Sequence, residues 1–204
     1  FFRLDLGGEE TQKEICHNSV VLKGKSISGV SLDCRTNYVC ISSLGGSCEA
    51  INPTQTIEID LSKDAAKNET MKAIAEEMSD CWWQFGEGKV DYLSLGDKGI
   101  WDKNTCAVCS IVKFDKKIQE EAEKITYEEF YDYLEKTEKT SSQKYLKYLY
   151  GVSSLDNFYS DRVFEAIKND VDGKKEIDFE AKYMIRTGVS SKAFFGNFGF
   201  SKDH

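Results

Sequence analysis

The stretch Cys81-Trp82-Trp83-Gln84-Phe85-Gly86-Glu87-Gly88 decides how this chain folds. It closes residues 62–85, where apolar side chains recur every three or four positions and predict one long amphipathic helix. We expect Ser62 to cap the start of this helix. Glycine readily adopts the left-handed conformation, so Gly86 and Gly88 are expected to end it. The predicted core stripe is Met71, Ile74, Ala75, Met78, Trp82 and Phe85, and the predicted solvent face is Glu69, Lys72, Glu76 and Glu77.

A Cys-x-x-Cys pair, Cys106-Ala-Val-Cys109, follows inside a β-branched run that predicts a central strand over residues 106–114. Residues three apart in a strand point to opposite faces of the sheet, which disfavours a bond within the pair and permits one bond outward from each face. We therefore expect Cys81 to form a disulfide with either Cys106 or Cys109, tying the helix to the sheet. A redox enzyme would instead place such a pair at the start of a helix, where the thiol pKa is lowered.

Seven cysteines and two histidines are present among the 204 residues. A zinc site made of thiolates usually shows two Cys-x-x-Cys pairs at ribbon spacing, and this chain has one. Disulfides formed in an oxidising compartment are the better explanation. The odd count leaves at least one thiol that is free or bonded to another molecule. The disulfide candidates are Cys16, Cys34, Cys40, Cys48, Cys81, Cys106 and Cys109.

The remaining sequence predicts one α+β domain over residues 1–204. Residues 14–61 are β-rich, with strands expected at 19–22, 27–32, 38–41 and 56–61. Residues 126–168 are mainly helical: a capping box at Thr126-Tyr-Glu-Glu129 opens a helix to about residue 136, and further helices are expected at 142–150 and 161–168. A strand at 177–189 precedes an aromatic tail, 190–204. We expect a mixed or antiparallel sheet packed by one long helix and several shorter ones, and stapled by disulfides.

Charge and hydropathy exclude some classes of partner. The chain has 27 Lys and Arg residues against 35 Asp and Glu residues, a net charge of −8, and no basic patch with interleaved aromatic residues. We therefore expect no nucleic-acid partner. No apolar run is long enough to span a bilayer, so membrane attachment is expected only through a segment upstream of Phe1. Asn68-Glu-Thr70 is a candidate glycosylation sequon, which agrees with export.

Motifs for catalysis are missing from the sequence. It has no Gly-rich phosphate loop, no Gly-x-Ser-x-Gly and no His-Glu-x-x-His, and His17 and His204 are the only histidines. Residues 169–173, Asn-Asp-Val-Asp-Gly, are similar to a calcium loop, but their register puts Lys168 and Phe179 where carboxylates are required. We interpret them as a turn between a helix and a strand. The sequence predicts no catalytic residue, no cofactor and no metal.

Aromatic side chains mark both chain ends and one internal cluster. Chain termini are usually polar. Apolar side chains at a terminus therefore either fold back onto the domain or contact copies of the same protein. Trp82 is expected in the core and Trp83 over a neighbouring loop, although Trp83 together with Trp101 is also suited to hold a sugar or a cation. The candidates for an assembly interface are Phe1, Phe2, Phe194, Phe195, Phe198 and Phe200.

The main motifs follow one another in a fixed order: Cys16-His-Asn-Ser-Val-Val, Leu32-Asp-Cys34-Arg-Thr, Pro53-Thr-Gln-Thr, Ile74-Ala-Glu-Glu-Met-x-x-Cys81-Trp-Trp-Gln-Phe-Gly-Glu-Gly, Cys106-Ala-Val-Cys109-Ser-Ile and Phe130-Tyr-Asp-Tyr-Leu134. This order resembles a group of uncharacterised archaeal surface proteins from small-genome lineages, over residues 14–150. The resemblance implies an ectodomain that follows a pilin-like or membrane-anchoring segment, which we expect upstream of residues 1–204, and it implies no activity.

Three functions are weighed on these grounds. The leading hypothesis is a non-enzymatic, exported surface protein, the self-assembling subunit of an extracellular filament or appendage. The first alternative is a membrane-anchored adhesion ectodomain that binds a host-cell glycan or peptide near Trp83 and Trp101. The second alternative is a thiol–disulfide oxidoreductase that uses Cys106 and Cys109. Copies of the same chain are the expected partners, with a cell-surface molecule as the other possibility.

Overall fold

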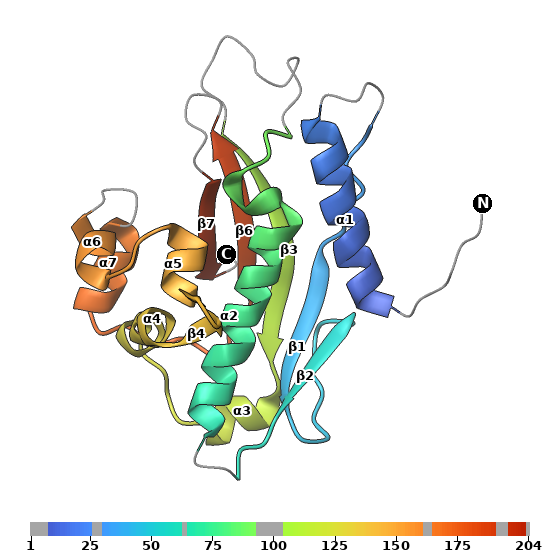
Figure 1. Ribbon diagram of the computed structural model, residues 1–204. Helices are drawn as coiled ribbons and strands as arrows, with labels where there is room; N and C mark the ends of the chain where they lie inside the picture. Colours follow the sequence, from blue (N-terminus) through green and yellow to red (C-terminus); the bar gives the residue numbers. More distant parts are fainter. Residues whose placement is uncertain are drawn as a thin grey trace.

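A computed structural model describes residues 8–25, 30–62, 65–92, 104–160, 165–190 and 196–202 (Figure 1). The helices are α1 (Gly8–Gly24), α2 (Ala66–Gln84), the short 3₁₀ turn η1 (Gly86–Gly88), α3 (Lys116–Glu121), α4 (Tyr127–Lys136), α5 (Tyr145–Tyr150), α6 (Leu155–Ser160) and α7 (Glu165–Asp172). The strands are β1 (Asn37–Ser43), β2 (Gln55–Ile59), β3 (Asn104–Phe114), β4 (Glu138–Thr140), β5 (Gln143–Lys144), β6 (Tyr183–Ser190) and β7 (Gly196–Lys202).

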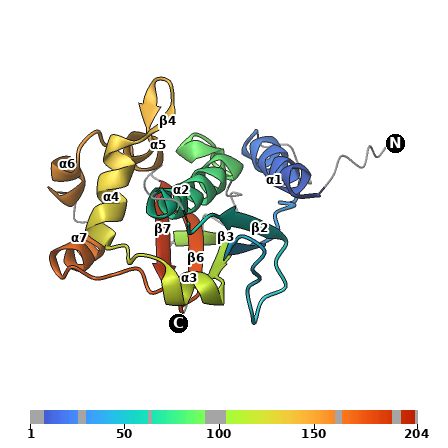
Figure 2. The same ribbon diagram turned by 90° about the horizontal axis from the view of Figure 1, so that it is seen from below.

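The main sheet has five strands in the order β2-β1-β3-β6-β7. Strand β1 runs parallel to both β2 and β3, whereas β3 pairs antiparallel with β6 and β6 antiparallel with β7. The expectation of an α+β fold with a mixed sheet is confirmed, and β3 is the central strand. Helices α1 and α2 lie on the same side of the sheet, and α4 to α7 group beside α2 (Figure 2).

Helix α2 is the helix predicted from the opening stretch of sequence. It begins at Ala66, three residues after the expected start, because Ser62 does not cap it: the Ser62 hydroxyl donates to Asp60, and the N-cap is Ala65, without a side-chain hydrogen bond. At the other end Gly86 and Gly88 have φ values of 78° and 69°, the left-handed conformation expected there.

The prediction of a strand at 19–22 was wrong, because these residues belong to helix α1. Cys16, Ser19 and Val20 are buried and lie three or four residues apart, so they form one helical face that packs on α2. Within the described residues the fold therefore has two long helices, α1 and α2, and not one. Of the strand expected at 27–32, residues 27–29 lie outside the described part and residues 30–32 form no strand.

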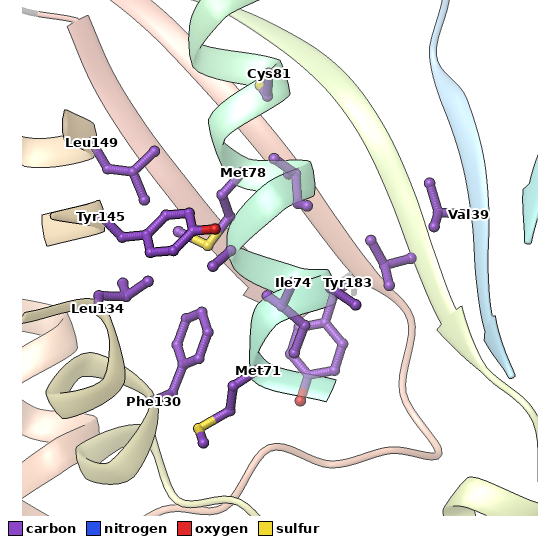
Figure 3. Packing of buried hydrophobic residues seen from close by; sticks show 14 of the residues in the cluster. Val39, Met71, Ile74, Met78, Cys81, Phe130, Leu134, Tyr145, Leu149 and Tyr183 are labelled. Atoms are coloured by element: carbon purple, nitrogen blue, oxygen red, sulfur yellow. The ribbon is translucent and has the colours of Figure 1, made fainter. Parts of the chain in front are cut away.

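The core lies between α2, the sheet and the helices of the second half (Figure 3). Ile74 and Met78 of α2 face Tyr183 of β6 on one side and Phe130 and Tyr145 of α4 and α5 on the other. Complete burial of one such apolar side chain stabilises a fold by roughly 1.5–3 kcal/mol. Helix α2 is thus the central element against which both halves of the chain pack.

The second half follows the prediction in part. The capping box is present: the backbone N–H of Glu129 donates to the Thr126 hydroxyl, and the Glu129 carboxylate accepts from the backbone N–H of Thr126.

Gly151 ends α5 with a φ of 74°, but α5 begins at Tyr145 because residues 143–144 form a hairpin strand. Of the helix expected at 161–168, residues 161–164 lie outside the described part and α7 extends to Asp172. The last predicted strand begins at Tyr183, since residues 177–182 form an irregular turn.

Candidate functional site

Six of the seven cysteines form three disulfides. Cys81 of α2 is bonded to Cys109 of β3, the helix-to-sheet link favoured by the sequence. The other two bonds join Cys16 to Cys34 and Cys40 to Cys48. They fasten α1 to the segment before β1, and β1 to the loop that follows it. The remaining cysteine, Cys106, is free and exposed.

The two cysteines of the Cys-x-x-Cys pair have different roles. Val108 pairs with Arg186 and Ser110 with Ile185, so Cys109 is the extra residue of a β-bulge. Cys109 is buried in its bond to α2, whereas Cys106 is exposed on the strand. A dithiol couple needs two sulfurs in contact with each other. The second sulfur here is committed to Cys81, so the geometry does not assemble the redox pair.

A buried carboxylate lies beside this disulfide. Glu77, predicted on the solvent face, is 2% exposed, and that prediction was wrong. Its carboxylate accepts a hydrogen bond from the Ser110 hydroxyl at 2.5 Å and from Lys13 of α1 at 3.2 Å, and Lys13 also contacts Asp80 at 2.6 Å. Burial alone lowers the pKa of Lys13, but the charges of Glu77 and Asp80 outweigh it and hold that pKa above its usual value. The cluster fixes α1 to α2 and α2 to β3.

Helix α2 carries a second buried stripe that explains this burial. Its members are buried and spaced three or four residues apart, and among them Glu77 contacts α1 and β3 while Cys81 is bonded to β3: Thr70, Ala73, Glu77, Cys81 and Gln84. The presence of Cys81 in this stripe was the available signal that Glu77, one helical turn earlier, points inward.

The tryptophan next to Cys81 is used in helix packing. The rings of Trp83 and His17 are stacked, with centroids 4.1 Å apart and an angle of 8° between their planes. The Nδ1–H of His17 donates to the main-chain carbonyl of Trp83 at 2.7 Å. Trp83 therefore packs on α1 and not over a loop, while Trp82 is partly buried. Trp101 lies outside the described residues, so the proposed aromatic binding pair is not assembled by the part of the chain that the structure describes.

A groove lies along edge strand β2, between it and α2. Its volume is about 530 Å³. Apolar and acidic side chains both line it, and Leu44 at its border is 60% exposed. The apolar members are Leu44, Ile57, Ile59 and Ala73, and the charged members are Glu58, Asp60, Glu69, Lys72 and Glu76. The β2 side of this groove could be predicted from the sequence, because the alternation Ile57-Glu58-Ile59 predicts a half-buried strand.

The opposite edge of the sheet is formed by the aromatic tail. Phe198 and Phe200 belong to β7, where their backbones pair with Thr187 and Ile185 of β6. The tail segment 196–202 is therefore folded onto the domain as an edge strand. The other interface candidates, Phe1, Phe2, Phe194 and Phe195, lie outside the described residues.

Three further features concern the glycosylation sequon, metal ligands and membrane-spanning helices. Asn68 of the sequon is exposed in the first turn of α2. Within residues 8–25, 30–62, 65–92, 104–160, 165–190 and 196–202, no group of three His, Cys, Asp or Glu residues is arranged to hold a metal ion. Among the helices of those same ranges, none combines the length and apolarity needed to cross a bilayer. Comparison with protein-family models, with curated proteins and with solved structures finds no match for this chain.

Proposed function

We propose that this chain is a non-enzymatic structural protein of the cell exterior, whose copies join edge to edge into an extended assembly. Three disulfides indicate folding in an oxidising environment. The resemblance to archaeal surface proteins agrees with this location, and an exposed Asn68 is available for glycosylation there. The open sheet described above supplies the means of assembly.

The observation that carries the proposal is the polarity of the two edge strands. β2 runs parallel to β3, and β7 runs in the same direction because two antiparallel steps separate it from β3. When β7 of one copy adds beside β2 of the next, the two strands form a parallel pair and the sheet continues across the junction. Such a contact joins two different surfaces, so it generates a ring or an open filament instead of a closed dimer.

The sequence of β7 complements the groove beside β2. Phe198, Phe200 and Lys202 alternate along this strand with small or polar residues. In a parallel pair Lys202 lies at the end of β2 where Asp60 and Glu69 border the groove. An extended segment of this pattern brings apolar groups to Ile57 and Ile59 and a cation to the acidic end.

The test compares two substitutions on the same strand. Ile57 lines the groove, whereas Thr56 is exposed on the other side of β2. Light scattering and negative-stain microscopy at increasing concentration are expected to show ordered oligomers for the wild type and for Thr56→Lys. The Ile57→Lys variant is expected to stay monomeric with an unchanged circular dichroism spectrum. Monodisperse wild-type monomers at all concentrations, or equal assembly of both variants, would rule out the proposal.

A further inference from the structure

The main sheet has a second face, on the side away from α1 and α2 (Figure 2). On β3, Cys109 and Ser110 both point to α2, through a disulfide and through a hydrogen bond to Glu77. Because the residues of a strand alternate between faces, Val108 before this bulge and Ile111 after it point to the second face. The central strand thus carries apolar side chains on both of its faces.

The neighbouring strands extend this apolar surface. Tyr38 of β1 and Met184 of β6 each precede a residue of the core, so both point away from the helices. They form one row across the sheet with Ile111, which pairs with each of them. Tyr38 is 39% exposed and Val108 is 36% exposed, as is typical of a surface that contacts another molecule. We call this surface the open face, and its residues are Tyr38, Cys106, Val108, Ile111, Met184 and Arg186.

The unpaired cysteine lies on the open face. Cys106 is exposed and stands two residues before Val108 on the same strand. The other six cysteines are bonded to one another, so the sulfur that matches Cys106 is Cys106 of a second copy. Such a bond requires two Cα atoms within about 7 Å, closer than the spacing of about 10 Å between packed sheets. Cys106 pairs with Gly188 of β6, which has no side chain and leaves space for this approach.

Two open faces match when a twofold axis runs parallel to β3, the central strand. Such an axis preserves the position of each residue along its strand, and it places β3 over β3 of the second copy and β1 over β6. Cys106, Val108 and Ile111 then meet their own counterparts. Tyr38 meets Met184 of the second copy on both sides of the axis, because the two residues share one row. Contact between a thioether and an aromatic ring is favourable.

The charged side chains of this surface lie outside the apolar centre of the contact. Arg186 is on β6, so the axis places it over β1 of the second copy and not over its own counterpart. Lys113, the charged residue in the sequence of β3, is at the end of the strand away from Cys106 and donates to the main-chain carbonyl of Glu180. The row of Tyr38, Ile111 and Met184 is therefore free to pack without these cations.

The size of the open face indicates a weak contact. Five strands about 4.8 Å apart, overlapping over the seven residues of β1 and β7, give about 550 Å² for each copy and about 1,100 Å² in total. Specific interfaces begin at about 1,000 Å², so a contact of this size is transient unless a covalent bond holds it.

We propose that the open faces of two copies pair about this axis and that a disulfide between their Cys106 residues holds them together. The oxidant is a low-molecular-weight disulfide. The Cys106 thiolate of one copy attacks it, forms a mixed disulfide and releases one small thiolate. The Cys106 thiolate of the second copy then attacks the protein sulfur and releases the other small thiolate. Two protein thiols are oxidised, one small disulfide is reduced, and the two protons pass from the protein thiols to the released thiolates. Without the oxidant the chain remains a monomer with a free Cys106.

The test incubates the full chain with oxidised glutathione and follows the dimer by non-reducing electrophoresis and peptide mass spectrometry. We expect a cross-link between the Cys106 residues of two copies. The matched control moves the thiol to an exposed position on α4, by Cys106→Ser together with Glu128→Cys. It is expected to form the mixed disulfide with glutathione but to dimerise about tenfold more slowly or less, because no paired surface brings its thiols together.

The pairing of Tyr38 with Met184 gives a second measurement. Met184→Glu is expected to slow dimerisation about tenfold, since it buries a carboxylate against an aromatic ring. Adding Tyr38→Lys is expected to restore the rate, because each new cation then meets the new carboxylate of the other copy. Circular dichroism shows that each variant is folded, and the rate of mixed-disulfide formation shows that its thiol is reactive.

Four outcomes would overturn the proposal: a mixed disulfide without dimer in the wild type, equal dimerisation of the moved thiol, an unchanged rate for Met184→Glu, or no recovery in the double variant. Ile57→Lys, which interrupts the contact between β2 and β7, is expected to cross-link at the wild-type rate. Failure of this dimer and failure of the edge-to-edge assembly are therefore distinguishable.

Discussion

Glu77 and Ser110 meet in the interior of the protein, where the Ser110 hydroxyl donates a hydrogen bond to the Glu77 carboxylate at 2.5 Å. A disulfide lies next to this contact: it joins Cys81, one turn after Glu77 on α2, to Cys109, the residue before Ser110 on β3. The β-bulge at Cys109 brings two consecutive residues of β3 to the same helix. Helix and sheet are thus joined by a covalent bond and a charged hydrogen bond within one helical turn.

Replacement of Glu77 by Ala is expected to destabilise the fold strongly. The change leaves the Ser110 hydroxyl and part of the Lys13 charge without their buried partner, and losses of this kind cost about 3–5 kcal/mol. Glu77→Gln keeps an acceptor for Ser110 and is expected to cost less. Urea unfolding gives the free energies. The exposed Glu128→Ala serves as the control, with an effect expected within about 0.5 kcal/mol. An equal effect at both positions would contradict the role of Glu77.

A single alkylatable thiol is expected in the unreduced protein. Because Cys106 is free and exposed while the other six cysteines are bonded, a thiol reagent should modify Cys106 both before and after unfolding. A non-reducing peptide map by mass spectrometry should show the three cross-links described above, and Cys106→Ser should abolish labelling. A cross-link between Cys106 and Cys109, or recovery of seven free thiols, is incompatible with this structure.

The three disulfides are expected to stabilise the fold unequally. Cys81–Cys109 closes a loop with a sequence separation of 28 residues, and Cys40–Cys48 one of 8. Loop-closure entropy in the unfolded chain then predicts a loss of roughly 3.5 kcal/mol for the double Ala variant of the first pair and roughly 2.5 kcal/mol for the second. Denaturant unfolding of the two variants measures both. A larger loss for the short loop would show that packing, not chain entropy, determines the order.

Stability is expected to fall in acid partly through Glu87. Burial alone raises its pKa, but hydrogen bonds donated by Lys89 at 2.6 Å and Tyr148 at 2.8 Å outweigh burial and hold that pKa below its usual value. A carboxyl whose pKa is lowered on folding stabilises the protein above the unfolded-state pKa of about 4.3, and this contribution is lost as the pH falls through the folded-state value.

The corresponding measurement is the free energy of unfolding at neutral pH and at about pH 3, for the wild type and for Glu87→Gln. The difference between the two pH values should be smaller in the variant, because the amide does not titrate. Glu128→Gln, at an exposed position, should retain the wild-type difference. If Glu87→Gln retained it as well, the contacts with Lys89 and Tyr148 would contribute nothing to the acid response.

The elements that the sequence predicted well are those whose signals are local. Helix α2 has a regular apolar period and two glycines at its end, and α4 has a complete capping box. Strand β3 is a β-branched run, and the alternation of faces along a strand was enough to place Cys106 and Cys109 apart. These signals depend on neighbouring residues only, so no knowledge of the tertiary contacts was needed.

The failures have a common physical origin in long-range contacts. Val20, Val21 and Leu22 favour a strand by their local preference, but Cys16 and Val20 pack on α2 only if the segment is helical, and tertiary packing overrides the preference. Strand β7 depends on its pairing with β6, which no local pattern reveals. The groove at β2 combines residues from separate parts of the chain, so the sequence alone does not define it.

All three disulfides lie between Cys16 and Cys109, and the last 95 residues of the chain, from 110 to 204, contain no cysteine. Under tension applied through its two ends, such a chain would yield unevenly. The C-terminal part can extend to its full contour length, starting with the edge strand β7. In the N-terminal part, the residues enclosed by each disulfide loop cannot extend while the bond is intact. The molecule thus combines a C-terminal segment that can extend fully with an N-terminal segment whose extension is limited by its three covalent loops.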